Sequence, residues 1–190
     1  MKKILIILLC FPALVQAQGI EKGYRGMVDV GYCLYISQID PSTIELTTSH
    51  GYQFNPYIYL GAGTGFDFTG SCSWGEVAGM AYHKRDSKVD IPLFFNARAN
   101  FTKTKIIPFV DGRIGSYVNN DGGIYATLTL GARYAIGNGI GLSFAAGYQI
   151  RKVTAQQLNL HYVNYKSYHY YTDLKDQSVD GFVFKLGVDF

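Results

Sequence analysis

The last ten residues of the chain place an apolar side chain at every second position. Residues 181–190 read GFVFKLGVDF, and every even-numbered position among them is apolar. Successive side chains of a β-strand point to opposite faces, so this segment predicts a strand with one wholly apolar face. The strand runs to the last residue, Phe190, and therefore ends on an aromatic ring.

Seven further segments show the same alternation, which makes eight with the C-terminal one. Each has about ten residues or slightly more, the length that a strand needs to cross a bilayer at the tilt of a barrel. Mature residues contain no run of roughly 18 consecutive apolar residues, the minimum for a spanning helix. The eight predicted strands are residues 28–37, 44–54, 57–69, 89–101, 108–118, 124–136, 140–151 and 179–190.

The connections between these segments differ in length according to their place in the order. Those after the second, fourth and sixth strands are short turns, at residues 55–56, 102–105 and 137–139. The longest connections, residues 70–88 and 152–178, follow the third and seventh strands. Outer-membrane barrels carry short turns at one end and longer loops at the other, whereas a β-sandwich has no reason to sort its loops in this way. The sequence predicts an all-β fold, an eight-stranded antiparallel up-and-down transmembrane β-barrel.

The N-terminus has the composition of a cleaved signal peptide. Lys2 and Lys3 precede an apolar run over residues 4–15, and Val15, Gln16 and Ala17 resemble a small-residue cleavage site. We therefore expect a signal peptide over residues 1–17 and a barrel domain over residues 18–190. Loss of the two lysines lowers the formal charge from +3 to +1, a balance that does not suggest a nucleic-acid partner.

The C-terminal pattern of a polar residue, a glycine and a terminal aromatic residue, here Lys185, Gly187 and Phe190, resembles the signal by which outer-membrane barrels are recognised during assembly. With residues 51–57 and 61–65, it makes the whole mature chain similar to the small OmpA/OmpX-type outer-membrane β-barrels, a porin-like family. The resemblance implies the outer membrane of a Gram-negative bacterium, lipid around the wall and a monomer. It also implies the barrel-assembly machinery and periplasmic chaperones as partners during biogenesis.

The inward face of the predicted barrel is rich in charge. An eight-stranded barrel is barely wide enough for its own side chains, and charges buried there must pair. We therefore expect a charge-balanced plug, with a narrow porin for ions or small solutes as the alternative. Asp189 would lie near the mouth. The predicted lumen network consists of Asp29, Glu45, Asp67, Asp90, Arg98, Asp111, Arg113, Arg133 and Lys185.

Residues for catalysis or metal binding are sparse. A lipid A-modifying barrel enzyme would need a nucleophile beside a base, but Ser49 and His50 are adjacent and point to opposite faces of a strand. Ser167 and His169 stand in the reverse order of the deacylase pattern. We expect no enzymatic activity, no metal and no cofactor, since His83, His161 and His169 show no tight ligand spacing. Whether Cys33 and Cys72 form a disulfide is left open.

The last connection is rich in tyrosine, and this composition has two interpretations. Tyrosine is enriched at recognition surfaces, so the segment is a candidate binding site for an extracellular ligand. The sequence slightly favours the other interpretation, in which the last two strands continue as a hairpin beyond the membrane, with tyrosines at headgroup level. Both are compatible with a structural or adhesive role at the cell surface. The tyrosines are Tyr162, Tyr165, Tyr168, Tyr170 and Tyr171.

Overall fold

The structure, a computed structural model, describes residues 22–36, 42–77, 80–119, 123–137, 139–164 and 167–190. Over residues 72–85 and 153–177 the description covers the backbone. The predicted signal peptide lies outside the described residues. Among the described residues, no helix has the length and apolarity to cross a membrane.

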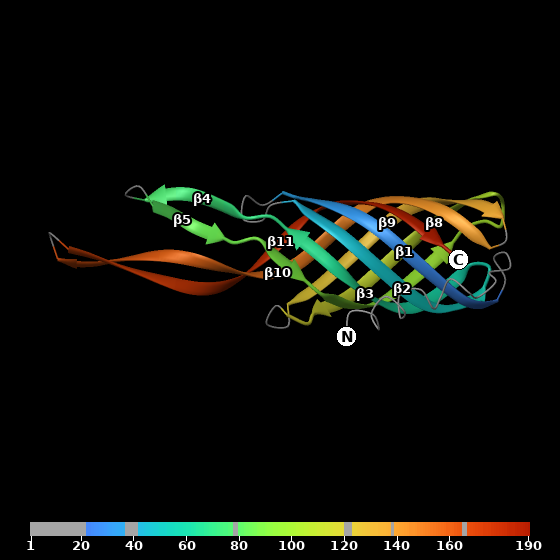
Figure 1. The fold of residues 1–190 in the computed structure, drawn as a ribbon, viewed down its shortest axis with the longest axis horizontal. Helices are drawn as coiled ribbons and strands as arrows, with labels where there is room; N and C mark the ends of the chain where they lie inside the picture. The colour runs from blue at the N-terminus through green and yellow to red at the C-terminus, as the bar shows by residue number, and fades with distance from the viewer. Residues whose placement is uncertain (1–21, 37–41, 78–79, 120–122, 138, 165–166) are drawn as a thin grey trace, which may run out of the picture.

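Eight strands close into an antiparallel barrel, as predicted (Figure 1). Each strand pairs with the next around the ring, and the last pairs with both its predecessor and the first. The strands, in ring order, are β1 (Gly23–Tyr35), β2 (Thr43–Asn55), β3 (Ile58–Thr69), β7 (Pro92–Asn100), β8 (Ile106–Tyr117), β9 (Ile124–Gly137), β10 (Ile140–Asn164) and β11 (Ser167–Asp189).

The wall is apolar on its outside and polar on its inside. Alternate residues of the strands expose large apolar side chains, among them Phe95 at 73%, Leu130 at 65% and Leu186 at 65%. The residues between them are buried and mostly polar or charged. This is the inverse of a water-soluble protein, whose exposed apolar patches are limited in size, and it fits a wall surrounded by lipid.

The short turns have the local chemistry that the sequence indicated. The Asn55 side-chain oxygen accepts hydrogen bonds from the backbone amides of Tyr57 (2.9 Å) and Ile58 (3.0 Å), which fixes the turn between β2 and β3. Gly137 and Gly139 have φ angles of 139° and 82°, in the region that favours glycine. Gly137 ends β9, and Gly139 directly precedes β10.

The predicted strand over residues 89–101 is divided in two. A short strand, β6 (Lys88–Asp90), pairs with β3, and β7 begins after Ile91. Because Pro92 has no amide proton, the ladder is interrupted there. Ile91 instead receives a hydrogen bond from the Val118 amide (2.9 Å) and donates its own amide to the Asn119 side chain (2.9 Å).

The two longest connections are built from strands. β10 and β11 remain paired beyond the barrel, from Lys152 opposite Ser178 to Tyr162 opposite Tyr168. This pairing confirms the interpretation that the sequence slightly favoured, in which the last two strands continue as a hairpin beyond the barrel. The other connection contains a hairpin of β4 (Cys72–Val77) and β5 (Met80–Arg85).

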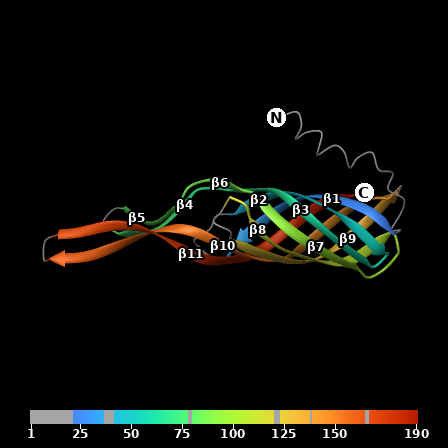
Figure 2. The same cartoon turned by 90° about the horizontal axis from the view of Figure 1, so that it is seen from below.

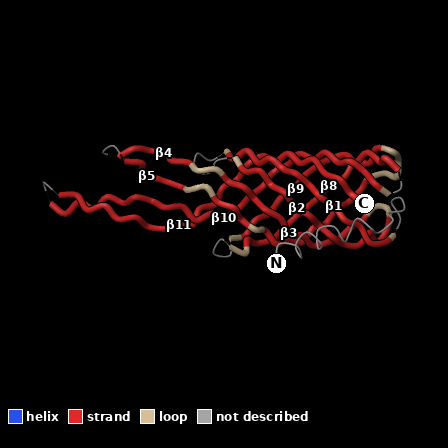
Figure 3. The backbone as a smooth tube through the Cα atoms, viewed as in Figure 1, coloured by secondary structure: helices blue, strands red, loops and turns tan. Residues whose placement is uncertain are grey.

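Both extensions project from the same end of the barrel. Figures 1 and 2 show them pointing away from the end where the C-terminus lies, and Figure 3 shows that strand makes up most of their length. β5 joins β10 at two positions, with Lys84 opposite Gln156 and His83 opposite Gln157. We call the part of β10 and β11 between residues 152 and 178 the arm.

Candidate functional site: the lumen network

The structure places all nine residues of the predicted lumen network inside the barrel. Each has an exposed fraction of 5% or less. The residues come from eight strands, β6 included, because alternation turns every second residue of each strand inward. Burial of so many charges requires partners, and the contacts fall into three groups along the barrel axis.

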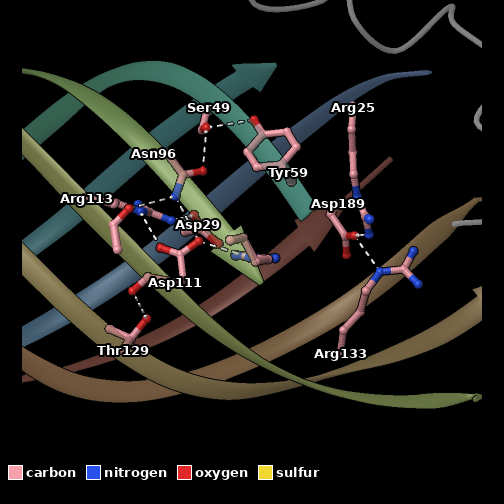
Figure 4. Close-up of polar contacts among 12 residues, drawn as sticks. Arg25, Asp29, Ser49, Tyr59, Asn96, Asp111, Arg113, Thr129, Arg133 and Asp189 are labelled. Atoms are coloured by element: carbon pink, nitrogen blue, oxygen red, sulfur yellow. Dashed lines mark hydrogen bonds and ion pairs between the residues drawn. The ribbon is translucent and has the colours of Figure 1, made fainter. Parts of the chain in front are cut away.

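Arg113 is the centre of the middle group (Figure 4). Its guanidinium donates to Asp29 Oδ2 (2.5 Å), to Asp111 Oδ1 (3.1 Å) and to Thr47 Oγ1 (3.0 Å). Arg113 lies on β8 and Asp29 on β1, which stand four strands apart in either direction around the ring. This ion pair therefore joins opposite walls of the barrel.

Asp111 extends the middle group toward the neighbouring strands. Its Oδ2 accepts from Arg98 Nε (2.9 Å) and from Asn96 Nδ2 (2.9 Å). Asn96 Oδ1 accepts from the Ser49 hydroxyl (3.0 Å), which is also hydrogen-bonded to the Tyr59 hydroxyl (3.0 Å). Loss of one partner of such a buried pair typically destabilises a fold by about 3–5 kcal/mol, because the other charge stays buried and uncompensated.

A second group lies beside the C-terminus, where Asp189 binds two arginines (Figure 4). Arg133 Nε lies 2.5 Å from Asp189 Oδ2, and Arg25 binds the same oxygen. Arg25 also donates to Gln53 Oε1 (3.0 Å). Arg25 was not among the predicted lumen residues, because the first strand was expected to begin at residue 28. Continuing the alternation backwards from Asp29 would have placed it in the lumen.

A third group fills the end from which the arm projects. Glu45 pairs with Lys185 (3.3 Å) and accepts a hydrogen bond from Gln149 (2.7 Å). The Tyr117 hydroxyl donates to Asp67 Oδ2 (2.8 Å).

Two further cations lie at this end of the lumen. Arg151, fully buried, donates to the Thr43 hydroxyl (3.2 Å). It lies on the polar face of a predicted strand but was not included in the predicted network. Lys88 Nζ lies 3.0 Å from Asp90 Oδ1, so Asp90 also has a cationic neighbour.

Aromatic rings occupy much of the remaining interior. The Arg98 guanidinium lies 4.1 Å from the centre of the Phe109 ring, and that of Arg113 lies 5.1 Å from the Phe94 ring. Glycines make room for these rings. A methyl group on Gly63 would lie 2.5 Å from Phe94, and one on Gly131 would lie 2.5 Å from Phe109.

The C-terminal residues singled out in the sequence take part in closing the barrel. Lys185 and Gly187 face the lumen, where Lys185 pairs with Glu45. Phe190 exchanges two backbone hydrogen bonds with Gly26, at 2.8 Å and 2.9 Å. A methyl group on Gly26 would lie 2.6 Å from the Phe190 ring, which therefore packs directly against this glycine.

Ser49 and His50 point to opposite faces, as expected, so they form no catalytic pair. Ser49 belongs to the lumen, whereas His50 lies on the outer face between two hydroxyls. Its Nδ1 lies 2.6 Å from the Tyr24 hydroxyl and its Nε2 lies 2.9 Å from Thr48 Oγ1. These bonds explain how a histidine is tolerated on an otherwise apolar face.

Other candidate residues are placed only in part. Cys33 is a buried free thiol, so the structure contains no disulfide between it and Cys72. The side chains of His161, Ser167 and His169, and those of the five tyrosines, lie outside the described part. Among the described residues, no group of three or more histidine, cysteine or acidic side chains is placed to hold a metal.

Comparison with solved structures supports the architecture. Neisserial surface protein A (NspA) is similar with a TM-score of 0.57 and 13% identity, over 88% of this chain and 96% of that chain. A de novo designed protein, TMB2.3, has a TM-score of 0.45 and 16% identity, over 90% of this chain and 94% of that chain. No protein-family model and no curated protein matches the sequence. At 13% identity, the likeness to NspA establishes the fold.

Proposed function

We propose that the protein is an integral outer-membrane barrel that acts through its exposed surface, in a structural or adhesive role, and that its lumen is closed to solutes. The observation that carries this proposal is the ion pair of Arg113 and Asp29, which crosses the full width of the barrel. The alternative is a narrow porin that passes ions or small solutes.

Further contacts that cross the lumen support a closed interior. Gln149 of β10 reaches Glu45 of β2, and Arg151 of β10 reaches Thr69 of β3 at 3.4 Å. In the ring, β10 is a neighbour of neither β2 nor β3. A solute passing along the axis would have to separate several buried, charge-assisted hydrogen bonds at once, and these are the strong ones.

The arm supports a binding role. β10 pairs with β9 as far as Arg151 and then continues to Asn164, 13 residues further. At about 3.3 Å per residue, these residues span roughly 40 Å. The pairing of β1 with β11 ends at Tyr35 opposite Gly181, so the arm lies beyond the last residue that β1 pairs with. An extended strand edge of this kind suits recognition by the addition of a partner's strand. The arm also contains the five tyrosines of the sequence analysis, a residue type enriched at recognition surfaces.

The apolar outer face and the NspA-like fold support a location in the outer membrane. The opposite orientations of Ser49 and His50 support a role without catalysis. We further propose a monomer that reaches the membrane through periplasmic chaperones and the barrel-assembly machinery.

Single-channel recording in a planar bilayer tests the closed lumen. We expect no discrete openings from the refolded protein, and openings from the double variant Arg113→Ala, Asp29→Ala, which lacks the crossing ion pair. The matched control is Lys152→Ala, which removes an exposed cation outside the lumen. Insertion is verified by the mobility shift between unboiled and boiled samples. Discrete openings from the unaltered, correctly inserted protein would replace this proposal with the narrow porin.

The binding role is tested by shortening the arm. Replacing residues 153–177 with a two-residue Asn-Gly turn joins two residues that are already opposed, Lys152 and Ser178. The shortened barrel should insert normally, whereas cells that display it should lose adherence to cultured cells. Undiminished adherence of the shortened form would contradict a binding role for the arm.

A further inference from the structure

We propose that the turn between β7 and β8 is a binding site for an anionic phospholipid of the leaflet on the side of the short turns. The turn carries two exposed lysines, Lys103 and Lys105, and each lies over a tyrosine ring of a neighbouring segment. The inference rests on the proposed location in a membrane, and it is independent of the closed lumen and of the arm.

This turn lies at the end of the barrel that also holds the C-terminus (Figure 1). In the antiparallel ring, β7 and β11 stand four strands apart and therefore run in the same direction, so both finish at that end. Phe101 and Ile106, on the two sides of the turn, are 60% and 57% exposed. The apolar wall therefore reaches the turn, which lies where that wall gives way to lipid headgroups.

Hydrogen bonds hold the turn in a defined shape. The Thr104 hydroxyl donates to the Ile106 carbonyl oxygen (2.6 Å), and it lies 3.1 Å from the Thr102 hydroxyl. The carbonyl oxygen of Lys105 accepts a hydrogen bond from the Ala135 amide (2.8 Å), which ties the turn to β9. Because the backbone that carries the lysines is already ordered, less conformational entropy is lost when a ligand binds.

Tyrosine rings place the two ammonium groups on opposite sides of the turn. Lys103 Nζ lies 5.1 Å from the centre of the Tyr57 ring, which belongs to the turn between β2 and β3. Lys105 Nζ lies 5.0 Å from the centre of the Tyr134 ring of β9. Both distances are within the range of cation–π attraction. Both rings are 44% exposed, and tyrosine is the residue type typical of headgroup level.

Apolar side chains occupy the wall between the two tyrosines. In ring order, Tyr57 precedes β3, Phe101 and Ile106 lie on β7 and β8 or next to them, and Tyr134 lies on β9. A phospholipid suits this arrangement, because its phosphate can meet the ammonium groups while its acyl chains run along Phe101 and Ile106. A free phosphate would use only the cations.

The charge at this end favours an anionic partner. Within the described chain, Asp189 is the acidic side chain of this end, and it is 1% exposed and bound by Arg25 and Arg133 inside the lumen. The two lysines therefore meet the leaflet without a described carboxylate side chain to compete for them. Near a membrane surface, each lysine raises the affinity for anionic lipid by about fivefold.

The test compares two lipids that have the same acyl chains and different headgroups. Native mass spectrometry of the refolded mature protein measures the binding of phosphatidylglycerol, which is anionic, and of phosphatidylcholine, which is zwitterionic. We expect phosphatidylglycerol to bind more tightly by about fivefold or more. Lys103→Gln with Lys105→Gln should abolish this preference, whereas Lys103→Arg with Lys105→Arg, which keeps both charges, should retain it.

Lys22→Gln is the matched control, because it also removes an exposed lysine from this end. Lys22 precedes β1, which stands four strands from β8 in either direction, so the preference should remain. The mobility shift between unboiled and boiled samples verifies that each variant forms a barrel, so a lost preference is distinguished from a failed fold. An unchanged preference in the double glutamine variant, an equal loss in Lys22→Gln, or displacement of the lipid by millimolar inorganic phosphate would overturn the proposal.

Discussion

At the scale of single residues, the packing of the lumen is close enough for one methyl group to matter. A methyl group on Gly187 would lie 2.1 Å from Asp29 Oδ1 and 2.8 Å from Ser143 Oγ. Gly187→Ala should therefore displace Asp29 from Arg113. We expect the free energy of unfolding to fall by about 1–3 kcal/mol, the usual range for overpacking. Urea titration in lipid vesicles, followed by far-ultraviolet circular dichroism, measures the change.

Gly112→Ala provides the matched control for that substitution. Gly112 is also a strand glycine, but the nearest atoms to its added methyl group would be 3.9 Å and 4.0 Å away, in ordinary contact. Both variants make the same change of residue type, so the difference between them reports the clash with Asp29. Equal stabilities of the two variants would show that the lumen yields to the methyl group without cost.

Alternation in the sequence predicted which face each residue occupies, but not its partner. It placed Asp29 and Arg113 in the lumen, because period two determines the side of the wall. Their ion pair joins positions 84 residues apart on opposite walls, and no local pattern encodes that meeting. Arg25 was missed for a different reason, since the first strand was expected to begin only at residue 28.

At the scale of elements, the sequence predicted the barrel strands well, but it bounded the last two strands at residues 151 and 179 and left their continuation as one of two interpretations. Strand prediction relied on an apolar face, which β10 and β11 need only where lipid surrounds them. Beyond the membrane, paired backbone groups suffice to continue a ladder, so a polar composition does not end the strand. The interruption at Ile91 shows the converse case, where an apolar segment is broken because Pro92 cannot donate to the ladder.

The register of the arm can be tested by cysteine cross-linking. Thr154 and Asp176 are opposed, and opposed residues have Cα atoms about 4.5–5.5 Å apart, within the range for a disulfide. Thr154→Cys with Asp176→Cys should therefore oxidise to an intramolecular disulfide, seen as protection of both thiols from maleimide. The background carries Cys33→Ser and Cys72→Ser.

The control pairs Thr154→Cys with Leu174→Cys, which is two positions out of register. Diagonal neighbours are about 7–8 Å apart, so this pair should remain reactive toward maleimide. Efficient cross-linking of both pairs would indicate a mobile segment, and cross-linking of the control alone would indicate another register.

At the scale of the whole molecule, stability depends on closing the seam between the first and last strands. β1 and β11 bring together residues more than 150 positions apart, such as Met27 opposite Asp189. Without this seam the sheet would expose two unpaired edges to lipid, where unsatisfied backbone groups cost several kcal/mol each. A closed barrel should therefore resist dodecyl sulfate until it is boiled.

Phe190 lies at this seam, and its substitution separates the energetics of closure from recognition during assembly. Phe190→Ala keeps the backbone bonds to Gly26 but removes the ring that packs against it. The lost apolar contact should lower the free energy of unfolding by about 1–2 kcal/mol, measured after refolding into vesicles without any assembly machinery.

If the terminal aromatic residue is also a recognition signal, as the resemblance to outer-membrane barrels implies, the heat-modifiable form in cells should fall several-fold below the yield of refolding. Phe190→Tyr, which keeps an aromatic ring, should behave like the unaltered protein in both assays. Equal losses in vesicles and in cells would assign Phe190 to the seam alone, because packing against Gly26 would then account for the whole effect.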